Sequence, residues 1–389
     1  MYVTRPLSEL LKSAELVAAP PDGPNSGILV IQDEESVTYS CFGCCMNRSL
    51  NHLPFPQDKE LTVKYTRSSG DSVQLSLDPL FFIPVLGLPL SSNRYYAIVP
   101  HKKRKGEAFT CSREDDKVSC CFCRCVKDVK PRSLDPNNIY QQFEIVPYDF
   151  LCSGCGGYFF ANSVASDGFP PYFLRRKGWT IFTKTPKHFK LGPALGLDSQ
   201  LRARLPQLDS TASTTVVGKW YAPFIFVKEG TLRDQVERSM YYEVTLDQRW
   251  DRIFSCRRNV RSDSHVVIDA TIEKEQVFVA GTKASWNGRN AVDGVIWFGA
   301  VGGGVGLRVE LVERMKWEEE RGGWIGGGGG EEREVKIHRV EEFQKEGGGD
   351  WNEFGCYVLV ETFNFRRMDG SLVMSYDFNH FHQLKTRWE

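Results

Sequence analysis

Residues Cys356–Phe381 read CYVLVETFNFRRMDGSLVMSYDFNHF. Two segments rich in β-branched and aromatic residues flank a four-residue turn, Met368-Asp369-Gly370-Ser371. An Asp-Gly pair between two such segments is a strong signal for a β-hairpin, because both residues accept the backbone angles of a tight turn. The stretch therefore predicts a long antiparallel hairpin near the end of the chain.

Short strand-like segments recur through the first half of the chain. LTVKYT (61–66) and SVQLSL (72–77) alternate apolar and polar residues on either side of RSSGD, which predicts a second hairpin. Further segments of this kind are ILVIQ (28–32), RYYAIV (94–99), KVSCCFCRCV (117–126), QQFEIV (141–146) and GYFFANSV (157–164). No strand–helix–strand alternation links them, so the first half is predicted to be antiparallel and β-rich.

The second half mixes helix and strand patterns. TLRDQVERSMYY (231–242) and TLDQRWDRIFSC (245–256) each begin at a threonine that can cap a helix, and both place apolar residues at helical spacing. GLRVELVERMKWEEER (306–321) also predicts a helix. The remaining segments are DSQLRARL (198–205), which is helix-like, HVVIDATI (265–272) and QVFVAG (276–281), which are strand-like, and the N-terminus, where a helix is expected to open at Thr4.

The fold class that these patterns predict is α+β and β-rich. Antiparallel sheets form an N-terminal domain over residues 1–205, and residues 216–389 form a mixed α/β C-terminal domain. A polar segment of small residues, 206–215, is the expected linker. Glycine runs at 326–330 and 347–349 bracket acidic segments and are predicted to be mobile loops.

Composition argues against a partner attracted by overall charge. The 389 residues carry 49 Lys and Arg against 49 Asp and Glu, so no net field draws the chain to nucleic acid or an anionic membrane. The most apolar run, residues 80–90, is about half the roughly 20 residues that span a bilayer and contains two prolines. With no signal-peptide pattern at the N-terminus, the sequence predicts a cytoplasmic or nuclear protein without a transmembrane segment.

The 12 cysteines are expected to stay free thiols in a reducing compartment unless a metal binds them. SCCFCRC (119–125) alternates and is interpreted as one strand that buries its thiols as small apolar side chains. Cys41 with Cys44, and Cys152 with Cys155, have the spacing of zinc knuckles and form the alternative, a zinc site with four sulfur ligands. Because the two pairs lie far apart in the sequence, zinc remains the alternative and no cofactor is predicted.

No GxSxG, HExxH, P-loop or kinase signature occurs in the sequence. Gly302–Gly306 follows a strand-like segment and precedes a predicted helix, and it is interpreted as a tight strand-to-helix loop rather than a phosphate-binding loop. His380 and His382 share one face of the last predicted strand and could ligate a metal, although such a pair on an edge strand is more often solvated. The chain is therefore predicted not to be an enzyme, with an unrecognised enzyme class as an alternative.

Two stretches are rich in cations. His101–Lys105 is a compact basic run that can serve nuclear import, contact phosphate or form a solvated hairpin tip. Residues 168–192 interleave cations with aromatic rings, which together can bind single-stranded nucleic acid or an anionic lipid surface. Its candidate ligand-binding residues are Arg175, Arg176, Lys177, Trp179, Lys184, Lys187 and Lys190. Structural packing of the rings is the preferred interpretation, and a protein is the first expected partner.

Four longer motifs resemble a known family: MYVTRPLS (1–8), ASDGFPPYFLRRKGW (165–179), VVGKWYAPFIFVKEG (216–230) and ERMKWEEERGGW (313–324). The chain resembles, over nearly its whole length, the plant family catalogued as domain of unknown function 1262. The resemblance implies a plant protein of unknown activity with stress-responsive expression, and it transfers no functional residue. The expected function is a non-enzymatic binding or interaction protein in stress or defence, with a zinc-binding protein as the alternative.

Overall fold

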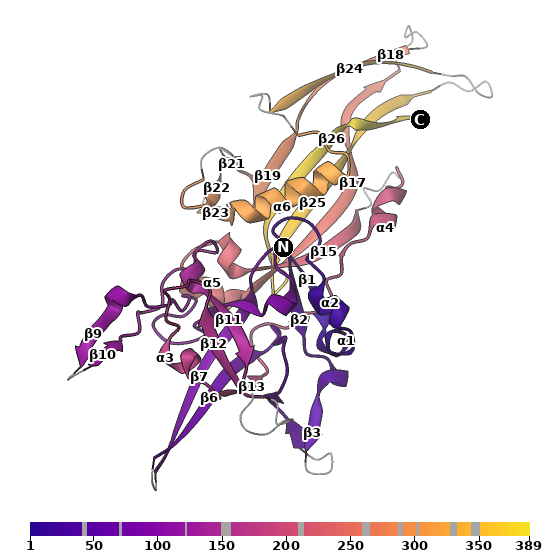
Figure 1. Cartoon of the computed structure of the whole chain (residues 1–389). Coiled ribbons are helices and arrows are strands. Elements are labelled where there is room, and N and C mark those ends of the chain that lie inside the picture. Colours follow the sequence, from indigo (N-terminus) through magenta and orange to yellow (C-terminus); the bar gives the residue numbers. More distant parts are fainter. Residues whose placement is uncertain are drawn as a thin grey trace. The chain divides into compact units, whose positions relative to one another are not determined.

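The computed structural model describes residues 1–40, 45–69, 72–120, 123–148, 157–208, 214–258, 265–286, 291–300, 303–326, 333–343 and 351–389. The protein is β-rich with several antiparallel sheets, which confirms the predicted class (Figure 1). It divides into unit 1, Met1–Leu195 with Trp220–Tyr242, and unit 2, Gly196–Lys219 with Glu243–Glu389. The linker expected at 206–215 stays a prediction, and 209–213 lie outside the described residues.

Unit 1 contains a seven-stranded sheet in the order β12-β11-β8-β7-β6-β13-β5. Its strands are β5 (Ser49–Leu50), β6 (Glu60–Ser69), β7 (Ser72–Pro84), β8 (Arg94–Ile98), β11 (Gln142–Pro147), β12 (Phe159–Ser163) and β13 (Thr180–Lys184). All neighbours pair antiparallel. The β6–β7 pair confirms the hairpin predicted from residues 61–77 and extends it to a register in which Leu61 faces Leu80.

The other elements of unit 1 are short. They are β1 (Tyr2–Pro6), β2 (Gly27–Ile31), β3 (Thr38–Ser40), β4 (Cys45–Asn47), β9 (Lys117–Cys120), β10 (Cys123–Val126), β16 (Val227–Lys228), α1 (Leu7–Lys12), α2 (Ala14–Ala18), α3 (Tyr172–Arg175), α5 (Leu232–Arg238) and 3₁₀ turns at 34–36, 90–92, 114–116, 139–141 and 224–226. The first helix begins at Leu7 rather than Thr4, because Tyr2–Pro6 pair in parallel with β2. The threonine cap predicted for α5 is confirmed: the Thr231 hydroxyl accepts from the Asp234 amide at 3.2 Å.

The interpretation of SCCFCRC as one strand is wrong. β9 and β10 form an antiparallel pair in which Cys123 faces Cys120, so the chain folds back within the motif. Cys125 is exposed, and Val118 on the neighbouring strand is exposed as well. The expected burial of the thiols therefore does not hold for Cys125.

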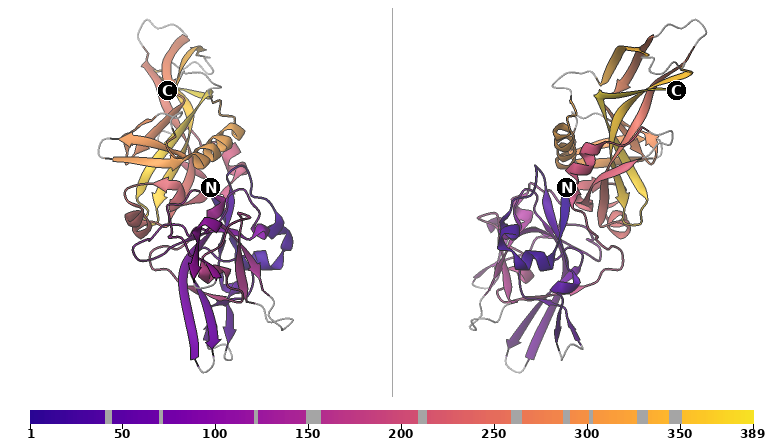
Figure 2. Two further views of the ribbon diagram at one scale, coloured as in Figure 1. Left: turned by 60° about the vertical axis from the view of Figure 1, so that its left-hand side comes forward. Right: turned by 90° about the vertical axis from the view of Figure 1, so that its right-hand side faces the viewer.

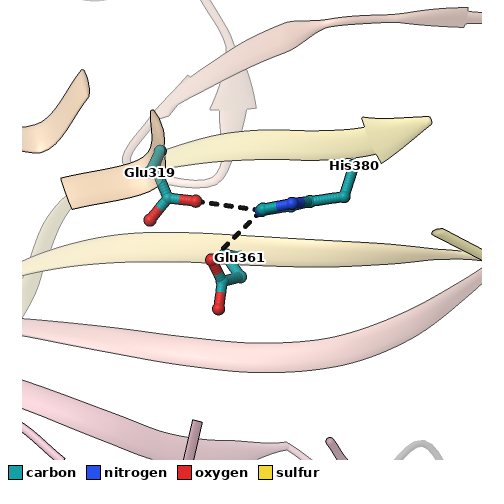
Figure 3. Close-up of side chains that lie close together, drawn as sticks. All are labelled: Glu319, Glu361 and His380. Carbon is teal, nitrogen blue, oxygen red and sulfur yellow. Dashed lines mark hydrogen bonds and ion pairs between the residues drawn. The ribbon is translucent and has the colours of Figure 1, made fainter. Parts of the chain in front are cut away.

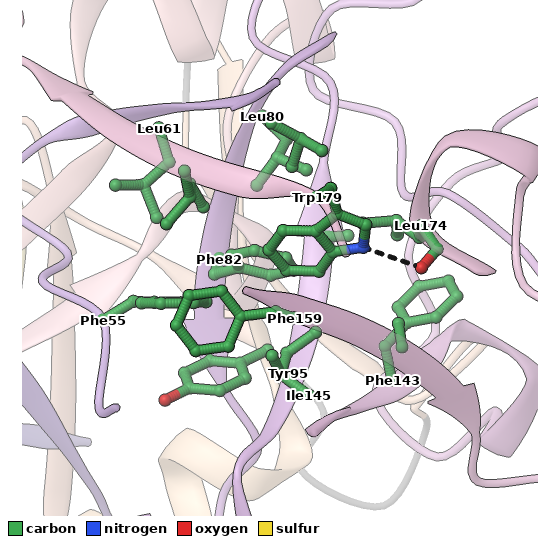
Figure 4. Packing of buried hydrophobic residues seen from close by; sticks show 14 of the residues in the cluster. Phe55, Leu61, Leu80, Phe82, Tyr95, Phe143, Ile145, Phe159, Leu174 and Trp179 are labelled. Atoms are coloured by element: carbon green, nitrogen blue, oxygen red, sulfur yellow. Dashed lines mark hydrogen bonds between the residues drawn. The ribbon is translucent and has the colours of Figure 1, made fainter. Parts of the chain in front are cut away.

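The core of unit 1 is aromatic (Figure 4). The Phe55 ring meets the Phe159 ring edge-on at 5.1 Å between centroids, and Phe159 packs on Trp179 at 5.4 Å. Trp179 is fully buried, and its indole Nε1 donates to the Leu174 carbonyl at 2.9 Å. Burying such rings is among the largest apolar contributions that a sheet can make to stability.

Unit 2 is organised by a sheet that contains three long strands. β17 (Tyr241–Arg257), β25 (Glu353–Arg367), β26 (Leu372–Trp388), β19 (Glu275–Val279) and β20 (Thr282–Lys283) follow one another in one sheet. The β25–β26 pair, yellow in Figure 1, confirms the hairpin predicted from residues 356–381 and its turn at Met368–Ser371.

The remaining elements are β14 (Gly196–Leu197), β15 (Thr215–Pro223), β18 (His265–Glu273), β21 (Ser285–Trp286), β22 (Val295–Ala300), β23 (Gly303–Arg308), β24 (Glu334–Glu342), α4 (Ser199–Arg204) and α6 (Val309–Arg321). Leu311, Val312 and Met315 are buried along α6, as its helical spacing predicts. Both views in Figure 2 show this helix, in orange, against the yellow strands of the β25–β26 hairpin. Residues 327–330 and 347–349 of the predicted glycine loops lie outside the described residues.

Two predictions for the second half are wrong. TLDQRWDRIFSC belongs to strand β17, because Leu246, Gln248 and Trp250 are buried in alternation, a period of two. The glycine run is part of strand β23 rather than a strand-to-helix loop: Gly306 pairs with Trp297 of β22. Residues 301–302 of that run lie outside the described residues.

Candidate functional site

A buried cluster of Glu319, Glu361 and His380 lies in unit 2 (Figure 3). Glu319 comes from α6, Glu361 from β25 and His380 from β26. At most 1% of each residue is exposed. His380 Nε2 lies 3.0 Å from Glu319 Oε2 and 3.0 Å from Glu361 Oε2. Three groups that can bind a metal or share a proton thus converge on one point.

Local structure explains why these side chains turn inward. Glu319 follows Met315 by one helical turn and Leu311 by two, so it continues the buried stripe of α6. Glu361 and His380 sit on strands inside the sheet, since β25 pairs with both β17 and β26, and β26 pairs with both β25 and β19. The interpretation of the two histidines as a solvated pair on an edge strand is therefore wrong for His380.

His382 does not belong to the cluster. It is exposed, and its ring centroid lies 5.9 Å from that of His380. The pairing of the two strands shifts register here: Leu359 faces His380, whereas Val358 faces Leu384. This bulge separates the environments of the two histidines, because an irregular register re-aims neighbouring side chains.

Arg202 of α4 supplies a buried cation to the cluster. Its Nε donates to Glu361 Oε1 at 2.9 Å, its Nη1 to the Glu318 carbonyl at 3.0 Å and its Nη2 to Glu319 Oε1 at 3.4 Å. One turn before Glu318 on α6, Arg314 Nη1 pairs with Glu318 Oε2 at 3.0 Å. Among the described residues, the three carboxylates of this network thus pair with two guanidinium groups, and one positive charge remains to be supplied.

Two further residues hold Arg202 and Glu361 in place. Gln248 Nε2 donates to Glu361 Oε1 at 2.7 Å and to the Arg202 carbonyl at 3.2 Å. Gly322, directly after α6, leaves room for the guanidinium: a Cβ at this position would lie 2.0 Å from Arg202 Nη2. The close approach of α4 to the end of α6 therefore depends on glycine at 322.

Protons can supply the missing charge. Burial, together with the negative charge of Glu361, raises the pKa of Glu319 to about 8. Burial lowers the pKa of His380, but its hydrogen bonds to Glu319 and Glu361 outweigh this effect and raise the pKa to about 9. Burial also disfavours the Glu361 carboxylate, yet hydrogen bonds from His380 and Arg202 hold the pKa of Glu361 well below its ordinary value.

A divalent cation is the other way to supply positive charge. Donor atoms 3.0 Å apart match the spacing of neighbouring ligands around an ion with bonds of about 2.1 Å. A cavity of about 380 Å³ borders the cluster and is lined in part by Arg202, Gln248 and Glu361. An ion or water can approach the buried carboxylates from this side.

Sequence reasoning identified only His380 as a candidate metal ligand and missed Glu319, Glu361 and Arg202. The predicted zinc ligands Cys41, Cys44, Cys152 and Cys155 lie outside the described residues. In the part of the chain that the structure describes, the Glu319–Glu361–His380 cluster is the one group of three or more His, Cys, Asp and Glu side chains close enough to hold a metal.

The residues predicted to bind an anion have different surroundings in unit 1. Arg175 Nη1 pairs with Asp128 at 2.9 Å, the Arg176 guanidinium lies over the rings of Tyr65 and Tyr172, and the Lys177 ammonium lies over that of Phe160. Lys184, Lys187 and Lys190 are exposed. The prediction that Trp179 binds a ligand is wrong. Trp179 lies in the core with its indole donor satisfied, so its ring is not available to stack on a ligand.

Comparison with known proteins gives a family match over part of the chain and no activity. Residues 22–122 match the family described as protein of unknown function (DUF1262), which confirms the resemblance over this part of the chain. No curated protein matches. Among solved structures, the chain is similar to the crystal structure of Cry35Ab1, with a TM-score of 0.44 and 12% identity over 86% of this chain and 90% of that chain. No helix within the described ranges is long and apolar enough to cross a membrane.

Proposed function

We propose that this chain is a metal-binding protein that holds one divalent cation between Glu319, Glu361 and His380. The observation that carries the proposal is the convergence of three buried donor atoms on one point. Two carboxylate oxygens and one imidazole nitrogen form a mixed donor set, which suits Mn²⁺, Fe²⁺ or Zn²⁺ better than Ca²⁺ or Cu⁺.

The role that we infer for the metal is structural or ligand-holding rather than catalytic. Both oxygens of Glu361 already accept hydrogen bonds from Arg202, and those of Glu319 contact Arg202 and His380. A carboxylate that keeps these contacts and also binds an ion has few lone-pair sites left, so it is a poor general base. This supports the expectation of a binding protein; the role in plant stress or defence rests on the family resemblance.

Metal analysis of the full chain tests the proposal. The protein is stripped with a chelator, equilibrated with Mn²⁺ or Zn²⁺, freed of unbound ion and measured by elemental mass spectrometry. One Mn²⁺ per chain is expected, and Glu319→Gln should lose it because a carboxamide carries no negative charge. Glu320→Gln is the matched control, since Glu320 is the exposed neighbour on the same helix.

Two metals separate this site from the cysteine pairs. Thiolates bind Zn²⁺ well and Mn²⁺ poorly, so Zn²⁺ retained by Glu319→Gln would indicate the cysteine site predicted from the sequence. Equal Mn²⁺ content in the parent protein, Glu319→Gln and Glu320→Gln, or none in any of them, would refute the Glu319–Glu361–His380 site.

A further inference from the structure

A second cavity, of about 290 Å³, lies wholly within unit 1. Its apolar lining includes Phe81, Phe189, Val236 and Met240, all of them buried. The Phe81 and Phe189 rings lie 5.7 Å apart between centroids. An apolar wall of this kind favours an apolar ligand, because burying its surface removes it from water.

The charged lining of this cavity is mainly positive. Three lysines, Lys105, Lys184 and Lys187, and one carboxylate, that of Glu60, line the cavity. Lys105 also pairs with Glu237 at 3.4 Å, so three ammonium groups meet two carboxylates and one positive charge is left over. Glu60 is already engaged by His101 at 3.0 Å and by Lys184 at 4.0 Å. Among the described residues, Lys187 has no ion pair and is exposed, so its ammonium is available to an anion.

The cavity unites the two basic stretches of the sequence. His101 and Lys105 come from the compact basic run, whereas Lys184 and Lys187 come from the cationic–aromatic stretch. Phe189 of the same stretch supplies part of the apolar wall. The sequence left two interpretations of this alternation of lysine and aromatic residues: packing of the rings, or binding of a ligand. Both apply here, because rings pack inward and some of the cations gather around one opening.

We propose that this cavity binds a small molecule with an apolar body and a single anionic group. A volume of about 290 Å³ lies at the small end of ligand pockets, so the body is a fused ring pair or a short chain rather than a long acyl chain. The anionic group lies at the lysines and the body against Phe81, Phe189 and Met240. This site shares no residue with the metal site of unit 2 and does not depend on it.

Isothermal titration of the full chain with naphthoate tests the site, with naphthamide as a probe of similar shape that carries no charge. Naphthoate should bind at least tenfold more tightly than naphthamide, and the difference should shrink as salt is raised, because exposed charges are screened. Equal affinity for the two probes would overturn the proposal, as would an absence of naphthoate binding.

Exposed lysines offer a matched set of variants. Lys187→Gln should weaken naphthoate binding by about threefold to tenfold, and combining it with Lys184→Gln should weaken binding further. Lys190→Gln is the control, because Lys190 is an exposed lysine of the same stretch and does not line the cavity. An equal effect of Lys187→Gln and Lys190→Gln would show that naphthoate responds only to general surface charge.

One more variant separates this proposal from the metal site. Glu319→Gln should bind naphthoate with the affinity of the parent protein, since Glu319 belongs to unit 2 and the cavity to unit 1. Loss of naphthoate binding in that variant would mean that naphthoate binds at the buried cluster, and it would refute the proposed site in unit 1.

Discussion

Arg202 is the residue on which the charge balance of the buried cluster depends. It contacts Glu318, Glu319 and Glu361 through one guanidinium. Removing one partner of a buried ion network costs far more than removing an exposed charge, because the remaining charges stay out of water without compensation.

Arg202→Met should therefore destabilise the protein by about 3–5 kcal/mol in urea unfolding. Arg204→Met, two residues later on the same helix, changes an exposed arginine and should be nearly neutral. Adding Glu361→Gln to Arg202→Met should recover part of the loss, since it removes an uncompensated carboxylate. Similar unfolding curves for Arg202→Met and Arg204→Met would contradict this account of the network.

The shared protons make stability depend on pH. The pKa values of Glu319 and His380 are raised in the folded state, to about 8 and about 9. A group with a raised pKa stabilises the fold below its unfolded pKa and loses that contribution as the pH rises through the folded value. The metal-free protein should thus lose stability, on the order of 1–3 kcal/mol, as the pH rises from about 5 to about 9.

Urea unfolding at several pH values, in the presence of a chelator, measures this loss. Glu319→Gln should show a shallower decline, because the amide has no proton to lose. Saturating Mn²⁺ should act in the opposite direction, since a metal competes with protons for the same atoms and binds more tightly as the pH rises. A chelated protein whose stability increases from pH 6 to pH 9 would contradict the proposed sharing of protons.

At the level of elements, the site depends on how α4 meets the end of α6. Gly322 has ordinary backbone angles, so an alanine there would not strain the chain itself. Replacing glycine by alanine at such positions normally stabilises a protein by about 0.4–1 kcal/mol through the unfolded state. At position 322, however, the added Cβ would overlap Arg202 Nη2 at 2.0 Å.

Gly322→Ala should consequently destabilise the protein by roughly 1–3 kcal/mol, because the guanidinium must move away from Glu361. Gly192→Ala is the control: the nearest atom to a Cβ at 192 is 3.7 Å away, which is ordinary contact. Thermal unfolding of both variants gives the comparison. A more stable Gly322→Ala protein would show that α4 is not held in this position.

At the scale of the whole molecule, the two proposed sites belong to different compact units. Every residue of the metal cluster lies in unit 2, and every lining residue of the lysine-rimmed cavity lies in unit 1. Coupling between two sites requires that each ligand bias a shared equilibrium. The two sites share no residue through which one ligand could change the affinity for the other.

Binding at the two sites should therefore be independent. The affinity for naphthoate should change by less than about twofold when Mn²⁺ is saturating, which corresponds to a coupling free energy below about 0.5 kcal/mol. Titration with and without Mn²⁺ measures this quantity directly. A larger change would mean that the units act together, and the same experiment on Glu319→Gln would then show whether the cluster is the source.

Much of the local structure was predictable because local patterns carry it. The Asp-Gly turn and its flanking apolar segments specify the β25–β26 hairpin, and the spacing of Leu311 and Met315 specifies α6. The same reasoning failed at Leu246 and Trp250. Their spacing of four fits one face of a helix and also one face of a strand, so the neighbouring strands of the sheet decided between them.

The sequence by itself determined the β-rich class, the two hairpins and most of the helices, since period and turn chemistry act over a few residues. Only the tertiary structure decided the site. Arg202, Glu319, Glu361 and His380 come from four elements spread along the chain. No local pattern records which distant side chains will meet, because their meeting depends on sheet order, register and the packing of α4 and α6 on the sheet.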